Sequence, residues 1–380
     1  MKRSFSNLPL VVAGTALIAV TYGLVRLAYG LVLPDVRADL AVDAVAAGSI
    51  SAGASLLYCV GAVTGFLAAA RSPRTLVVLA AGTAALGALG VAVSPSAAVF
   101  GASAVLASAG AGLASPALVR IVARGVPARD AGRAQTIVNS GTGAGLVAAG
   151  VLALVLLPDW RTAWLVSAVC AVLTGAAVLV TDRGARSGPR GNTALPPAAW
   201  FRQHGGLLVA ALLLGAGSAA VWNLGRAVVV DAGAGGTASV VAWIALGLGG
   251  AAVVLTARWL GARPVRTAWA ITVLAVALGT VGLGVGAAVV PVAFIACLVF
   301  GWGYTAATGV LIAWTSSLAP EHAPSGTSML FVTLVLGQAV GAAAAGGVLD
   351  HVGALLTMLG AALVAVAGIP TARVRQNGAP

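Results

Sequence analysis

Charged residues are scarce in this chain, and their scarcity decides the class of protein. Only 8% of the 380 residues are Asp, Glu, Lys or Arg, whereas about 25% is usual for a soluble domain. Hydrophobic residues make up 60%, and the mean hydropathy is +1.04. No run of short alternating strands indicates a membrane β-barrel. The composition therefore predicts an all-α membrane protein.

Acidic residues are the scarcest charged type, nine against 21 Lys and Arg, and none lies deep in an apolar segment. The resulting net charge of +12 would by itself suggest nucleic acid as a partner. The arginines, however, lie in short clusters between apolar segments, as cytoplasmic loops do. No basic patch with interleaved aromatic residues occurs, so we expect no nucleic-acid partner.

Cysteine and histidine are also rare, and neither forms a chemical motif. Cys59, Cys170 and Cys297 fall in separate apolar segments without metal-ligand spacing. The three histidines lie in polar segments, and no paired carboxylates or nucleophile–base motif occurs. We therefore expect no metal, no cofactor and no enzymatic activity.

Long hydrophobic runs are what the chain has in abundance. Hydropathy predicts twelve membrane-spanning helices of about 20 residues or more. The longest polar gap divides them into two pseudo-symmetric bundles of six: residues 1–181, a cytoplasmic linker at 182–205, and residues 206–380. The predicted spans are 9–33, 45–69, 75–94, 97–119, 134–157, 162–181, 206–230, 238–257, 266–288, 291–314, 326–349 and 353–371.

The distribution of positive charge predicts the orientation. With both termini in the cytoplasm, nearly every Lys and Arg falls in a cytoplasmic segment, as the positive-inside rule requires. Arg37 and Arg161 fall in outer loops, and Arg26 and Arg226 fall inside spans. The high Ala, Gly, Val and Arg content suggests a bacterium with GC-rich codons. We therefore expect a multi-pass, monomeric protein of the bacterial cytoplasmic membrane, with the lipid bilayer as its surroundings.

Arg26 is the central candidate for function. It lies about 12 Å along a helix from Pro34, close to the middle of a hydrocarbon layer whose half-thickness is about 15 Å. A charge there costs at least about 2.5–3.5 kcal/mol unless it meets a partner, water or a ligand. Tyr22 and Tyr29 stand at i−4 and i+3, so helical geometry predicts that all three share one face. We interpret this face as part of a solute path.

Arg226, in the seventh span, is the second charge inside the membrane. Trp222 and Asn223 precede it by four and three residues and share its predicted face. The spacing of Trp222 and Arg226 repeats that of Tyr22 and Arg26, as internal repeats of secondary transporters do. Arg226 also lies five residues from Asp231, so snorkelling to the outer surface is an alternative. Other polar residues inside spans are either interhelical hydrogen-bonding groups or cavity walls; they include Asn139, Tyr304, Thr308 and Gln338.

The pattern of six plus six spans resembles the major facilitator superfamily. GFLAAARSPRT at residues 65–75 resembles its G-x-L-a-D-R-x-G-R-R loop signature, and TARWLGAR at 256–263 resembles the second copy; both lack the Asp. The fourth span, AVLASAGAG at 104–112, keeps the glycines of a family motif but has Leu106 where many drug–proton antiporters carry Arg. TYGLVRLAYGLVLPDV at 21–36 and FVTLVLGQAVGAAAAGGVLDHVG at 331–353 resemble the bacterial YbfB/YjiJ-type branch.

The resemblance implies a transporter with a central cavity lined by spans one, four, seven and ten and open alternately to each side. Glycerol-3-phosphate antiporters of the superfamily place one Arg in each of the first and seventh helices to bind an anion, and Arg26 and Arg226 are similarly placed. The signature loops make gating candidates of Arg71, Arg74, Arg258 and Arg263.

Two positive charges without a deep carboxylate favour a small organic anion as the solute. The alternative is export of drugs or other hydrophobic compounds by proton antiport. It fits the aromatic residues but lacks the buried carboxylate that cation recognition and proton relays use. Asp35, beside Pro34, is the candidate for proton coupling; its alternative role is a solvated loop charge. A non-transporting sensor would need a larger soluble domain than this sequence contains.

Overall fold

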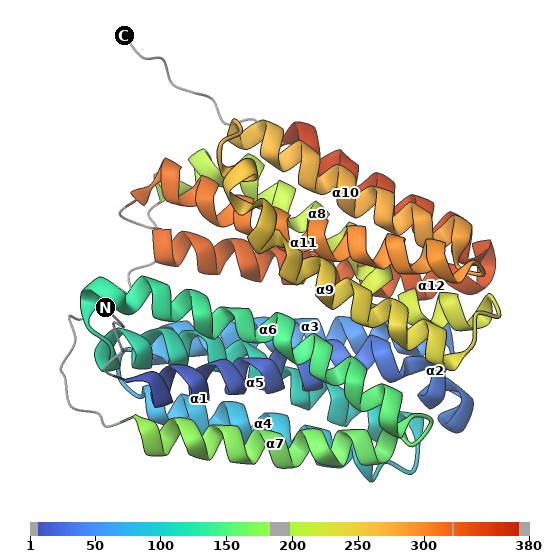
Figure 1. Ribbon diagram of the computed structural model, residues 1–380, viewed down its shortest axis with the longest axis horizontal. Helices are drawn as coiled ribbons and strands as arrows, with labels where there is room; N and C mark the ends of the chain where they lie inside the picture. The colour runs from blue at the N-terminus through green and yellow to red at the C-terminus, as the bar shows by residue number, and fades with distance from the viewer. Residues whose placement is uncertain (1–6, 183–197, 321–322, 372–380) are drawn as a thin grey trace. The chain divides into compact units, whose positions relative to one another are not determined.

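The computed structural model describes residues 7–182, 198–320 and 323–371. All regular elements in these ranges are helices (Figure 1). Their bounds are α1 Leu8–Ile18, η1 Ala19–Leu27, α2 Ala28–Leu40, α3 Ala44–Ala68, α4 Pro73–Ala92, α5 Ala97–Gly125, α6 Ala128–Leu156, α7 Trp160–Thr181, α8 Ala198–Asp231, α9 Gly236–Gly261, α10 Val265–Gly286, α11 Val290–Leu318 and α12 Ala323–Thr371.

Eleven helical segments in the described residues are long and apolar enough to cross a membrane. The sequence predicts twelve, and the difference lies in α12, where the helices at the predicted spans 326–349 and 353–371 meet directly at a kink. Gly353 interrupts it with φ 78° and ψ 169°, a conformation that is essentially restricted to glycine. A hydropathy window separates two apolar runs but does not predict how their backbones join.

Several helices extend beyond the predicted spans because hydropathy marks only the apolar part of a helix. α5 continues to Gly125, and α8 begins at Ala198, so residues 198–205 of the predicted linker are helical. Residues 183–197 of that linker lie outside the described residues.

The first span, Leu8–Leu40, changes its helical geometry in the middle. α1 and α2 are α-helical, but η1, with the sequence AVTYGLVRL, is a π-helix. A π-helix closes i→i+5 hydrogen bonds, so each turn holds about one residue more than an α-helical turn, and such turns are frequent at functional sites. Tyr22 and Arg26 both lie in η1. The predicted α-helical phase is therefore wrong in this segment.

The chain forms two compact units. Unit 1 consists of Met1–Val42 and Gly53–Thr193, and unit 2 of Asp43–Ala52 and Ala194–Pro380. The first residues of α3 thus pack with unit 2 and the rest with unit 1.

Unit 1 has an aliphatic core between α1, α4, α5 and α6, in which Leu17, Val77, Leu118 and Val138 are fully buried. Glycines bring α6 especially close to the first span. A Cβ on Gly141 would overlap the carbonyl oxygen of Thr15, and one on Gly145 would overlap that of Ala19. Small residues four apart allow such backbone contact between membrane helices.

Unit 2 repeats this packing between α8 and α12, its most extensive helix pair (Figure 1). A Cβ on Gly337 would overlap the carbonyl oxygen of Leu212, and one on Gly341 that of Ala216. Gly337 and Gly341 of unit 2 thus contact α8 in the way that Gly141 and Gly145 of unit 1 contact the first span.

Candidate solute-binding site

Arg26 lies in a cluster of polar aromatic residues in unit 1. Its guanidinium carbon is 4.5 Å from the centre of the Tyr58 ring on α3. The Tyr22 and Tyr58 hydroxyls are 3.0 Å apart, within hydrogen-bonding distance, and their rings meet edge to face. Tyr58 is 5% exposed, whereas Arg26 and Tyr22 are half-buried. A guanidinium over an aromatic face gains about 0.5–2 kcal/mol, which offsets part of its desolvation cost.

Tyr29 does not join this cluster, in contrast to the predicted shared face. Its buried ring stacks on Phe100 of α5 at 6.1 Å, and Phe100 meets the Trp160 ring edge to face. The cause is η1: its wider turns change the helical phase between Tyr22 and Tyr29.

Unit 2 brings together three predicted site residues from three helices. Trp222 of α8 meets Tyr304 of α11 edge to face at 5.2 Å. Gln338 of α12 donates a 3.0 Å hydrogen bond to the Tyr304 hydroxyl. Phe300 and Trp243 extend this aromatic cluster around Trp222. The Trp222 Nε1 is buried, with no hydrogen-bond partner among the described residues.

Asn223 and Arg226 point to other partners within unit 2. The Ser51 hydroxyl, in the first half of α3, donates to the Asn223 side-chain oxygen, and the Asn223 amide donates to the Ala219 carbonyl at 2.7 Å. Arg226 is only 3% exposed, and its Nε donates a 3.0 Å hydrogen bond to Ser239 of α9.

The two arginines do not occupy equivalent positions in the repeat. Ala19, whose carbonyl lies against Gly145, and Ala216, whose carbonyl lies against Gly341, serve as reference positions in the two units. Arg26 lies seven residues beyond Ala19, whereas Arg226 lies ten residues beyond Ala216. The repeated spacing of an aromatic residue and an arginine is therefore present in the sequence but shifted by about one helical turn in the structure.

Asn139 and Thr308 satisfy part of their hydrogen bonding on their own helices. Asn139 is exposed on α6 and accepts a 3.0 Å bond from Gln135, as their i, i+4 spacing predicts. The Thr308 hydroxyl donates to the Thr305 carbonyl at 2.8 Å on α11. Among the described residues, no group of His, Cys, Asp and Glu is placed to hold a metal ion.

Asp35, the candidate for proton coupling, lines a surface hollow of about 400 Å³ in unit 1. Asp39 and Asp159 border the same hollow, together with Arg161, which forms an ion pair with Asp39. Asp35 is half-buried, and Pro34 precedes it within α2.

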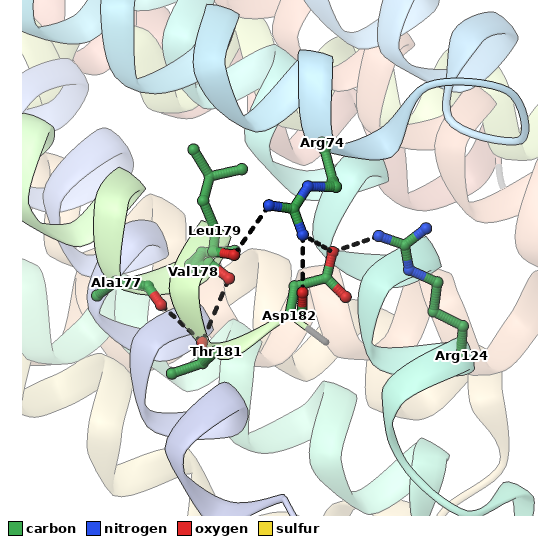
Figure 2. A network of polar contacts seen from close by, with 7 residues as sticks. All are labelled: Arg74, Arg124, Ala177, Val178, Leu179, Thr181 and Asp182. Atoms are coloured by element: carbon green, nitrogen blue, oxygen red, sulfur yellow. Dashed lines mark hydrogen bonds and ion pairs between the residues drawn. The ribbon is translucent and has the colours of Figure 1, made fainter. Parts of the chain in front are cut away.

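An ion network joins three helices of unit 1 (Figure 2). Arg74, at the start of α4, donates to the Asp182 backbone carbonyl at 2.7 Å and to the Leu179 carbonyl at 3.1 Å. The Asp182 carboxylate pairs with Arg124 of α5 and, at 3.5 Å, with Arg74. Its side chain is 1% exposed. Asp182 thus supplies a carboxylate to Arg74 of the signature segment 65–75, which contains no acidic residue of its own.

The other gating candidates, Arg71, Arg258 and Arg263, do not take part in the Asp182 ion network. Arg71 and Arg258 are exposed. Arg263 is also exposed, and its guanidinium lies over the Trp259 ring at 5.0 Å.

Sequence reasoning missed Tyr58 and the partnership of Asp182. Each of these residues has a feature in the sequence that could have identified it. Tyr58 is one of only four tyrosines in the chain, and Ser51, Ser55 and Tyr58 follow at i, i+4 and i+7, which places them on one face of α3. Asp182 is the acidic residue that directly follows the sixth predicted span.

The sequence profile of the Major Facilitator Superfamily matches residues 15–342. The chain belongs to this superfamily. Membership points to a transporter rather than an enzyme, and the apolar helices make it a multi-pass membrane protein. No curated protein sequence matches the chain closely enough to count as a relative.

Solved structures of the superfamily fold agree with this membership. The nucleoside transporter NupG has a TM-score of 0.78 at 12% identity, over 96% of this chain and 98% of that one. A D-xylose-proton symporter gives 0.75 at 16%, over 96% and 97%. A POT family transporter in complex with 5-aminolevulinic acid gives 0.76 at 12%, over 95% and 94%. At these identities the likeness shows the fold alone.

Proposed function

We propose that this transporter moves a small organic anion, a carboxylate, by alternating access. The observation that carries the proposal is the position of Arg26, half-buried in the π-helical middle of the first span beside two tyrosines. Ionisable residues at membrane depth are costly and by default functional. A guanidinium binds a carboxylate through two parallel hydrogen bonds, which suits it to this solute.

The Trp222, Tyr304 and Gln338 cluster is proposed as a solute contact within unit 2. It offers aromatic surface together with amide, indole and phenol groups. Asn223, Thr308, Asn139 and Tyr29 are secondary candidates. Arg226 is a second anion contact in the proposal, but Arg26 has the leading role because Arg226 is buried and hydrogen-bonded to Ser239.

The topology proposed for the chain has twelve spans, with α12 passing twice. Its apolar stretch Gly326–Thr371 has 46 residues, about 69 Å as a straight helix, which is more than twice a hydrocarbon layer of about 30 Å. Positive charge favours cytoplasmic termini and a bacterial cytoplasmic membrane. Arg71, Arg74, Arg258 and Arg263 would then be cytoplasmic. We further propose that the protein is a monomer and that it belongs to the YbfB/YjiJ-type branch.

Several rings around Trp222 favour a second candidate, the export of hydrophobic compounds by proton antiport. Trp243, Phe300 and Tyr304 present a largely apolar surface. This candidate needs a titrating group, for which Asp35 is proposed. It predicts that Asp35→Asn abolishes the pH dependence of transport, whereas the carboxylate proposal by itself does not.

Uptake into proteoliposomes tests the proposal, with a panel of radiolabelled carboxylates, cations and neutral compounds. We expect carboxylates to enter and Arg26→Ala to reduce their uptake about 10–100-fold, the range for losing a hydrogen bond to a charged group. Arg202→Ala, an exposed arginine at the start of α8, is the matched control and retains full uptake. Normal carboxylate uptake by Arg26→Ala would overturn the role given to Arg26. Uptake restricted to cations or neutral compounds would overturn the solute class.

A further inference from the structure

Tyr58 connects the two polar groups of the first span. Arg26 lies over its ring, and Tyr22 meets its hydroxyl. Tyr58 itself is buried on α3, so its position is fixed by packing. Tyr22 and Arg26 are half-buried and border accessible space. The buried tyrosine therefore holds two accessible groups side by side.

We infer that Tyr58 positions Arg26 for the carboxylate and that the Tyr22–Tyr58 hydroxyl pair binds a second oxygen, so that the solute is a hydroxy- or oxo-carboxylate. This inference rests on the proposed function and narrows it. It assigns a role to a residue that the sequence did not single out.

The contact with the ring explains the positioning. An aromatic face attracts a guanidinium through its π-electrons. Tyr58 therefore stabilises the charge of Arg26 and holds the guanidinium beside the Tyr22–Tyr58 hydroxyl pair.

The hydroxyl pair explains the second oxygen. Each phenol has one hydrogen to donate and can also accept. The Tyr22–Tyr58 bond uses one of the two hydrogens, and Ser115 of α5 is a further hydrogen-bonding neighbour of Tyr22. A chain of hydroxyls can reorient to donate to, or accept from, a solute oxygen. Tyr22 is the accessible member of this chain, so it makes the contact, and the oxygen lies beside the carboxylate held by Arg26.

Matched solute pairs test the solute class. We expect proteoliposomes to take up lactate, glycolate or malate about two- to tenfold better than propionate, acetate or succinate respectively, which is the range for one neutral hydrogen bond. Tyr22→Phe and Tyr58→Phe should reduce this preference to about onefold. If every carboxylate pair is taken up equally while Arg26→Ala still blocks uptake, the inference fails and the proposed function stands. If no carboxylate is taken up, both fail.

A second set of measurements tests the positioning role of Tyr58. In protein labelled with ¹⁵N-arginine, the Arg26 Nε–H resonance, assigned with Arg26→Lys, should be shifted by the ring current of Tyr58. Tyr58→Phe keeps the ring and should leave the shift almost unchanged. Tyr58→Leu should move it to the position of an exposed arginine and raise KM for both members of a solute pair. Phe201→Leu, a ring removed elsewhere, is the control. An Arg26 resonance that is the same in Tyr58→Leu and wild type would overturn the positioning role.

Discussion

Replacing Asp182 by Asn should destabilise the protein far more than removing an exposed acid. The Asp182 side chain is 1% exposed and pairs with Arg124, whose side chain is 18% exposed, and with Arg74, at 51% (Figure 2). The Arg124 Nε is buried, with no hydrogen-bond partner among the described residues. Asp182→Asn therefore leaves a largely buried guanidinium without its counter-charge.

The magnitude follows from this burial. Removing one partner of a buried ion pair costs about 3–5 kcal/mol, whereas the half-exposed contact with Arg74 contributes about 0–1 kcal/mol. The Asn side-chain oxygen can still accept one bond, so we expect a net loss of about 2–4 kcal/mol. For a unit of this size, that corresponds to a fall in Tm of roughly 5–12 °C.

Asp39→Asn is the matched control. Asp39 pairs with Arg161, but the two side chains are 44% and 40% exposed, so we expect a loss below about 1 kcal/mol. Thermal denaturation in detergent at a fixed scan rate measures both variants, because unfolding of such a protein is commonly irreversible. A thiol-reactive dye reports unfolding, since Cys59 and Cys297 are buried in the folded protein.

A double variant separates the ion pair from other effects of the substitution. Asp182→Asn combined with Arg124→Gln removes the stranded charge, so its Tm should lie above the value expected from adding the two single losses. Additive losses, or an Asp182→Asn shift no larger than that of Asp39→Asn, would refute the reasoning.

Three further predictions concern the backbone and a helix terminus, each followed by the same thermal assay. Gly145→Ala should lower Tm because its Cβ would overlap the Ala19 carbonyl. Gly143→Ala places its Cβ in open space and should raise stability by up to about 1 kcal/mol through helix propensity. Equal Tm shifts for the two variants would contradict the close contact at Gly145. Gly353→Ala should cost about 1–3 kcal/mol, because φ there is 78°; an unchanged Tm would argue against that backbone. Hydrogen bonds from Thr162 to Asp159, the N-cap of α7, hold the pKa of that carboxyl below its usual range. Asp159→Ala should therefore have a lower Tm than wild type at pH 6, and the difference should shrink as the pH falls through the folded-state pKa, below about 4; a difference independent of pH would count against this cap.

Apolar length and charge pattern predicted most of the fold. The predicted spans fall on the helices, several of which extend beyond them, and the superfamily resemblance is confirmed by the match over residues 15–342. These features are local properties of the sequence, because a span must be apolar along its whole length. The kink at which the last two predicted spans meet is not such a property, since it depends on the backbone angles of one glycine, Gly353.

The candidate site was only partly predictable. Trp222, Tyr304 and Gln338 come together as deep polar residues of one bundle would. Tyr29 was placed on the wrong face because the spacing rule assumes α-helical turns, and η1 is π-helical. The partner of Arg26, Tyr58, lies 32 residues further along the chain. Contacts between helices depend on tertiary packing, which one sequence does not specify by spacing alone.

The π-helical segment has a consequence for the length of the first span. A π-helical turn holds about one residue more than an α-helical turn over about the same rotation. Deleting one residue between Ala19 and Leu27 would therefore allow this segment to return to α-helical turns while α2 keeps its face toward its neighbours. A related chain that is one residue shorter between Tyr22 and Arg26 would keep the packing of α2 but change the spacing of its tyrosine and arginine. Residue number within this segment is therefore as much a determinant of the site as residue type.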